Sequence, residues 1–78
     1  MTYEVTLTDA IHDGESWTAN GSIVHRRTIE LPNDHGAWAP MREARKLFGY
    51  SGVNGRYISD DAWMPYNSTM MIHIQENY

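Results

Sequence analysis

One stretch of this chain, residues 40 to 50, has the pattern of an amphipathic helix, and it constrains the fold more than any other. Pro40 suits a first helical turn, where its missing backbone N–H leaves no hydrogen bond unmade, and Gly49 is suited to end the helix. The apolar residues recur on one helical face: Met41, Ala44, Leu47 and Phe48. A single helix of this kind needs an apolar surface to cover, and the rest of the chain must supply that surface.

The segments on either side of the helix have the alternation of apolar and polar residues that is typical of β-strands. We predict strands over residues 3–8, 22–31, 56–59 and 69–75. In the second of these, His25 and Arg27 interrupt the apolar face. That interruption favours a position at the edge of a sheet, or a bulge near Val24.

Turn residues place the breaks between these strands. Asp13-Gly14 is a turn signal. Asn20-Gly21 favours a type I′ hairpin turn, and residues 17–19 before it have the composition of a short strand. Residues 60–68 are expected to be an irregular connection, because Pro65 is unsuited to a central strand. Trp38 precedes the helix, and we expect it to pack under the first helical turn.

The predicted order of elements is β-β-α-β-β in a single domain that spans residues 1–78. One helix and several strands indicate an α+β fold, with an antiparallel sheet of about four strands and the helix packed on one face. The predicted inner residues of the sheet are Val5, Leu7, Ile29, Leu31, Ile58, Ile72 and Ile74.

No motif for catalysis, cofactor binding or metal binding is recognisable in the chain. The four histidines, His12, His25, His35 and His73, have no metal-ligand spacing, and cysteine is absent. Asp60 and Asp61 would share a site only if they lie in a turn, because neighbours in a strand point to opposite faces. We therefore expect no catalytic site, no cofactor and no metal.

Charge is distributed unevenly along the sequence. All six cations lie between residues 26 and 56, so residues 1–25, 26–56 and 57–78 carry net charges of −4, +3 and −3, within a total of −4. If the two ends of the chain lie together, one side of the molecule is acidic. Such a field affects which partners bind and how fast they associate.

This pattern predicts a protein-binding surface made of acidic residues with aromatic anchors. The expected partner-binding residues are Asp9, Asp13, Glu15, Asp60, Asp61, Trp63 and Tyr66. Trp and Tyr are enriched at the energetic centres of interfaces, although Trp63 is equally suited to closing the core.

Two other functions remain open. Arg42, Arg45 and Lys46 form a basic stripe on the helix, which Arg56 could extend into a nucleic-acid-binding surface. The acidic balance of the domain argues against direct nucleic-acid binding. An edge strand and several aromatic residues also fit a homo-oligomeric accessory protein, such as a homodimer.

A short helix carrying Ala44-Arg45-Lys46-Leu47, followed by glycines and the strand Arg56-Tyr57-Ile58, resembles the small phage-encoded inhibitor proteins, the anti-CRISPR proteins among them. The resemblance implies a protein without enzymatic activity that acts in the cytoplasm of a bacterial host. Its partner would be a basic subunit of a defence complex, whose nucleic-acid-binding surface it would block by acting as a DNA mimic. No basic and apolar leader and no membrane-spanning run is visible, so no association with a membrane is expected.

Overall fold

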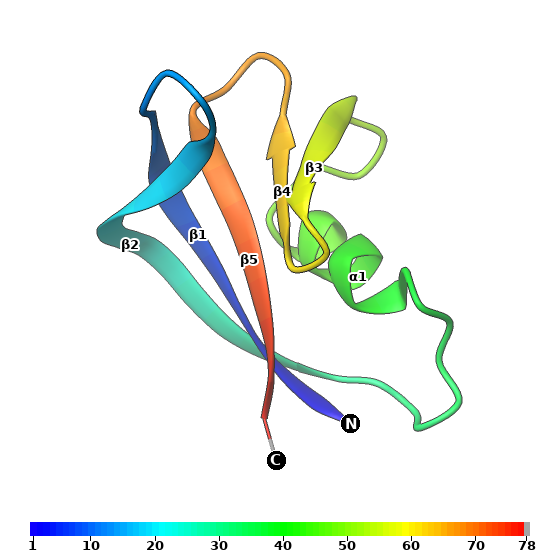
Figure 1. The fold of residues 1–78 in the computed structure, drawn as a ribbon. Coiled ribbons are helices and arrows are strands. Elements are labelled where there is room, and N and C mark those ends of the chain that lie inside the picture. The colour runs from blue at the N-terminus through cyan, green and yellow to red at the C-terminus, as the bar shows by residue number, and fades with distance from the viewer. Residues whose placement is uncertain (78) are drawn as a thin grey trace.

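The computed structural model describes residues 1–77 and contains one helix and five strands (Figure 1). In chain order these are β1 (Thr2–His12), β2 (Trp17–Glu30), α1 (Ala39–Leu47), β3 (Gly55–Ser59), β4 (Ala62–Pro65) and β5 (Met70–Asn77). All strands belong to one antiparallel sheet with the order β2-β1-β5-β4-β3. The predicted α+β class is confirmed, with five strands in place of about four.

Helix α1 covers one face of the sheet and encloses the main core. Met41 and Ala44 are buried against side chains from β1, β4 and β5, among which Val5 and Ile72 have no exposed surface. Because β1 and β5 are neighbours in the middle of the sheet, the two acidic ends of the sequence do lie side by side (Figure 1).

A second, smaller core lies on the opposite face. It contains Ala10, Ala62, Met64 and Met71, with Trp17 and Ile58 packed against it. Met64 follows Trp63 and Met71 precedes Ile72, both of which belong to the main core. Because successive strand residues point to opposite faces, the two methionines lie on the face away from the helix. Ile58 was predicted on the helix side, and that prediction is wrong.

The hairpin between β1 and β2 turns at residues 13–16. The sequence suggested a hairpin turn at Asn20-Gly21, and that prediction is wrong. Gly21 keeps a positive φ of 88° but lies inside β2, where the pairing with β1 is irregular. A second irregularity leaves Val24 without an opposite residue, because Leu7 pairs with His25 and Thr8 with Ile23. The predicted bulge near Val24 and the edge position of this strand are therefore confirmed.

Strand β4 was not predicted, because Pro65 argued against a central strand. Pro65 ends β4 and pairs only with Gly55 of β3, since β4 meets β5 through Ala62 and Trp63 alone. The missing N–H of Pro65 therefore breaks no bond to β5.

Two predictions about the helix are also wrong. Leu47 is 48% exposed, because the last turn of α1 extends to β2 at the edge of the sheet, where none of residues 1–77 covers it. Trp38 is 64% exposed and does not pack under the first turn. Within residues 1–77, no helix is long and apolar enough to cross a membrane.

Candidate partner-binding cleft

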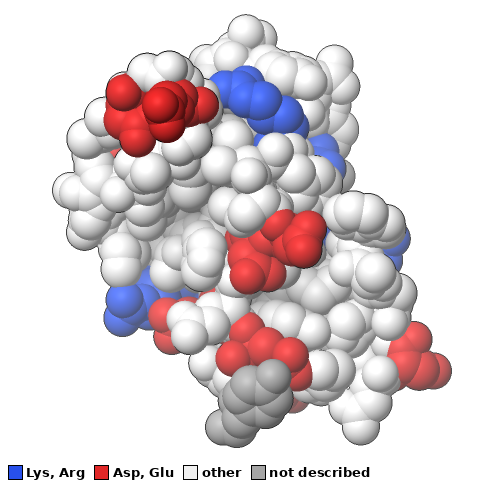
Figure 2. Space-filling model, in the orientation of Figure 1, with Lys and Arg blue, Asp and Glu red and all other residues white. Residues whose placement is uncertain are grey.

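The predicted acidic residues form two groups that lie far apart. Asp13 and Glu15 lie in the β1–β2 turn, whereas Asp60 and Asp61 form the β3–β4 turn. The second turn contacts Ile74, which lies opposite Val5 of β1, so the two groups are separated by roughly 25 Å along β1. Figure 2 accordingly shows acidic residues in separate groups and not as one continuous surface.

Asp13 has a role within its own turn. Its carboxylate accepts hydrogen bonds from the backbone N–H groups of Ser16 and Glu15, each at 2.9 Å. These two bonds lower the pKa of Asp13 below its ordinary value of 3.8, because they favour the charged form. Asp9, by contrast, is half-buried within β1, opposite Met70.

The two predicted aromatic anchors have different environments. Trp63 is only 2% exposed, and the Arg45 guanidinium lies 4.2 Å from the centre of its ring, so its side chain belongs to the core and cannot contact a partner. Tyr66 is 60% exposed, but it lies beside the Arg56 guanidinium, at 5.4 Å, and not beside Asp60 or Asp61. Trp63 as an anchor was therefore a wrong prediction.

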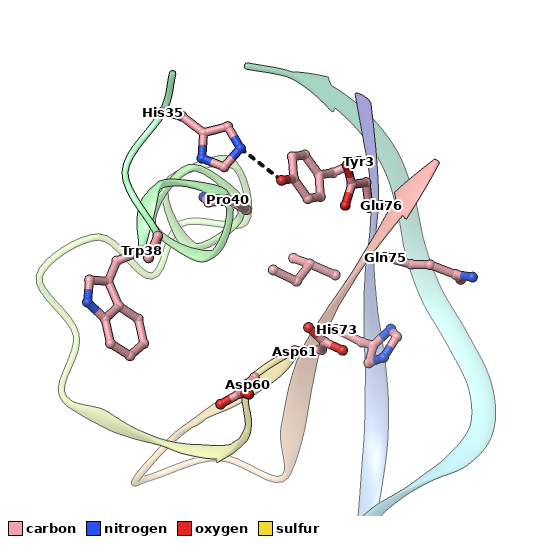
Figure 3. A pocket seen from close by; sticks show the side chains of 11 residues that line it. Tyr3, His35, Trp38, Pro40, Asp60, Asp61, His73, Gln75 and Glu76 are labelled. Carbon is pink, nitrogen blue, oxygen red and sulfur yellow. Dashed lines mark hydrogen bonds between the residues drawn. The ribbon is translucent and has the colours of Figure 1, made fainter. Parts of the chain in front are cut away.

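A cleft of about 800 Å³ lies where β5 extends past the end of β4 (Figure 3). Its walls come from β1, β5, the β3–β4 turn and the loop that leads into α1. The lining residues are Tyr3, His35, Ala37, Trp38, Pro40, Asp60, Asp61, His73, Ile74, Gln75 and Glu76. The Ile74 N–H donates to the Asp61 carbonyl at 2.9 Å, and beyond this bond β5 has no strand on its cleft side among the described residues.

Both carboxylates of the β3–β4 turn line this cleft. Ser59 pairs with Ala62, so Asp60 and Asp61 are the two residues of the turn and escape the alternation that would separate them in a strand. The Asp61 N–H donates to the Ser59 hydroxyl at 3.3 Å. Glu76 of β5 supplies a third carboxylate, at the other end of the cleft (Figure 3).

Tyr3 and His35 close that same end of the cleft. His35 Nδ1 is 2.8 Å from the Gly36 carbonyl, which can only accept, so Nδ1 carries a hydrogen. In the neutral ring, Nε2 then accepts from the Tyr3 hydroxyl at 2.9 Å. This pair attaches the loop before α1 to β1 and thereby fixes one wall.

Trp38 lies in the same loop and also lines the cleft, and sequence reasoning did not identify it as a site residue. It occupies the position before the first turn of α1 and makes no side-chain cap there. The centre of its ring lies 5.1 Å from the centre of the Tyr57 ring, and Tyr57 is itself 41% exposed. The only sequence feature that could have indicated Trp38 is that it is an aromatic residue in a loop rich in turn residues.

The charges of the cleft suit binding of a cation. Its ionisable side chains are those of Tyr3, His35, Asp60, Asp61, His73 and Glu76. Among residues 1–77, no three His, Cys, Asp or Glu side chains are grouped as a metal site. Carboxylates and an exposed indole ring in the same cleft suit a guanidinium or ammonium group, through charge and cation–π attraction.

The basic stripe predicted on α1 is reduced to Arg42 and Lys46. Arg45 turns inward: it donates to the Val53 carbonyl at 2.7 Å and covers Trp63. Arg56 lies between the rings of Trp17 and Tyr66, at 5.8 Å and 5.4 Å. These contacts use two of the four cations for packing, which weakens the case for a phosphate-binding surface.

Comparison with family models, with curated proteins and with solved structures finds no match to this chain.

Proposed function

We propose that the protein is a non-enzymatic inhibitor that binds a basic protein partner through the cleft formed by Trp38, Asp60, Asp61 and Glu76, here called the acidic–aromatic cleft. The observation that carries this proposal is the position of Trp38. An indole ring that is 64% exposed lines the same cleft of about 800 Å³ as three carboxylates. Large exposed aromatic side chains next to charged groups are typical of the energetic centres of protein interfaces.

The acidic–aromatic cleft suits an extended basic segment. An arginine or lysine of the partner would place its charge between the carboxylates and its alkyl stem against Trp38. The Ile74 N–H points to the β4 side, so by strand alternation the backbone of Glu76 also faces the cleft. These backbone groups can accept a short extended segment of a partner by strand addition.

The resemblance to anti-CRISPR proteins gives the proposal a partner class. A basic, nucleic-acid-binding subunit of a bacterial defence complex would meet carboxylates where it normally meets phosphates. The inhibitor would then compete directly with nucleic acid. This predicts that binding weakens as salt is raised, since the attraction depends on exposed charges.

The test is affinity capture from a bacterial host lysate with three forms of the protein: wild type, the Asp60→Asn/Asp61→Asn double variant and the Asp13→Asn/Glu15→Gln double variant. The second double variant is the matched control, because it removes the same charge from the distant β1–β2 turn. We expect the first variant to lose the partner and the control to keep it. Equal loss from both would refute the cleft as the site.

The captured partner should be a basic protein, and added DNA or RNA should release it. Failure of either expectation would count against the proposed function itself. Recovery of nucleic acid in place of a protein, lost when Arg42 and Lys46 are replaced, would favour the basic helix face instead.

A further inference from the structure

The longest strand of the protein, β2, has an edge with no partner among residues 1–77. It contains 14 residues, lies at the end of the sheet and pairs only with β1. The side chains along most of its length are exposed. A strand of this kind presents backbone N–H and C=O groups that are ready to pair with another strand.

The hydrogen bonds to β1 show which β2 residues face this open edge. The Leu31 N–H donates to the Met1 carbonyl at 2.8 Å, so residue 31 faces β1. In an antiparallel pair such residues alternate, so positions 29, 27 and 25 also face β1. The backbone groups of Arg26, Thr28 and Glu30 therefore point outward.

We propose that the protein forms a homodimer in which β2 of a second copy pairs antiparallel with this edge, on a two-fold axis through Thr28. Thr28 then lies opposite Thr28 of the second copy. Arg26 lies opposite Glu30 of the second copy, and the two-fold axis repeats this pair. Opposite charges and paired threonines are both favourable cross-strand neighbours.

Among the registers centred on an outward-facing residue, the charges favour the one through Thr28. Centring the axis on Arg26, or on Glu30, would place like charges opposite each other, which is destabilising. Nε of Arg26 already lies 3.4 Å from Oε1 of Glu4 on the neighbouring strand β1. Glu30 has no ion pair within the described residues. In the proposed dimer each Arg26 lies between Glu4 of its own chain and Glu30 of the other.

The helix side of the same edge carries a second complementary feature. Ile29, Glu43, Lys46 and Leu47 line a shallow groove of about 390 Å³, and Leu47 is 48% exposed. The register through Thr28 places Arg27 of the second copy opposite Ile29, on the helix side of the sheet. Its stem would cover Ile29, and its guanidinium would be directed toward Glu43.

The bulge at Val24 limits the pairing to the segment from His25 to Leu31, because a bulge disrupts the regular edge. In the single chain, Arg27 Nη1 donates to the outward-facing Arg26 carbonyl at 2.8 Å. Dimerisation replaces that bond with one from the Glu30 N–H of the second copy, which frees the Arg27 side chain for the groove.

Because the chain has no cysteine, single cysteines test the register directly. Thr28→Cys would place two thiols on the two-fold axis, with Cα atoms about 5.5 Å apart, within the range of a disulfide. Ser22→Cys is the control, since Ser22 is an exposed β2 residue beyond the bulge. Mild oxidation should convert the first variant, and not the second, to a species of twice the 9.0 kDa chain.

Light scattering on size-exclusion fractions supplies the measurement without a cross-link. Wild type should reach twice the mass of one chain as concentration rises, and Glu30→Arg should raise the dissociation constant about tenfold, since it replaces two favourable pairs with like charges. Adding Arg26→Glu to Glu30→Arg should restore the dimer by exchanging the charges. A single-chain mass at all concentrations, or a dimer that Glu30→Arg leaves unchanged, would overturn the proposal. This surface is separate from the acidic–aromatic cleft, so the two proposals fail independently.

Discussion

Replacing Trp63 and Trp38 in turn separates the core from the proposed binding site. Trp63 is 2% exposed and lies against Tyr50, Arg45 and the helix-side core. Burying a tryptophan removes roughly 150–250 Å² from water, which stabilises the fold by about 4–6 kcal/mol at ~25 cal/mol per Å². Core Trp→Ala variants lose about 3–5 kcal/mol.

A domain of this size has a free energy of unfolding of roughly 4–12 kcal/mol. Trp63→Ala should therefore remove a large part of it, whereas Trp38→Ala should change it by less than about 0.5 kcal/mol, because the Trp38 side chain is mostly in water. The assay is urea unfolding followed by far-UV circular dichroism. A Trp63→Ala variant within about 1 kcal/mol of wild type would refute the assignment of this residue to the core.

This pair of variants also affects how binding data are interpreted. Loss of a partner by Trp63→Ala would report partial unfolding and not a missing contact. Trp38→Ala keeps the fold and removes the proposed contact. A folded Trp38→Ala variant that captures the partner as well as wild type does would exclude the indole ring as an anchor.

Two further predictions concern stability. Gly55→Ala should lower the free energy of unfolding by about 1–3 kcal/mol, because a Cβ at Gly55 would lie about 2.3 Å from the Trp63 ring. Gly36→Ala is the control, since a Cβ at Gly36 meets nothing within 4 Å. Equal urea midpoints for the two variants would contradict this prediction. Asp13 contributes stability that is present above pH 3.8 and lost as the pH falls through its lowered folded-state pKa, because protonation weakens the acceptance of its two N–H bonds. An NMR titration should therefore give Asp13 a pKa below 3.8, and a pKa at or above that value would contradict the turn geometry.

The sequence was sufficient to predict the helix, the strand pattern and the α+β class, because each depends on local periodicity. It was insufficient for β4, because Pro65 was judged by its type and not by its place at the end of a strand. The choice between Asn20-Gly21 and Asp13-Gly14 as the hairpin turn also depended on long-range pairing. Both pairs contain a glycine with positive φ, so local chemistry alone did not separate them.

The site was less predictable than the fold for a similar reason. Charge blocks along the sequence grouped Asp60 and Asp61 with Asp13, which lies at a distant turn. Exposure decides whether an aromatic residue is an anchor, and exposure depends on tertiary packing. Trp63 and Trp38 therefore exchanged the roles that the sequence suggested.

We propose that the acidic–aromatic cleft recognises cationic protein segments. An NMR titration of the ¹⁵N-labelled protein with a short arginine-rich peptide tests this recognition, and an acidic peptide of the same length is the control. The three tryptophans give three indole N–H signals, so Trp38 can be followed separately from Trp17 and Trp63. We predict that the basic peptide alone shifts the Trp38 indole signal and the amide signals of Asp60, Asp61 and Glu76. Shifts confined to the Asp13–Ser16 turn, or an equal response to both peptides, would contradict the claim.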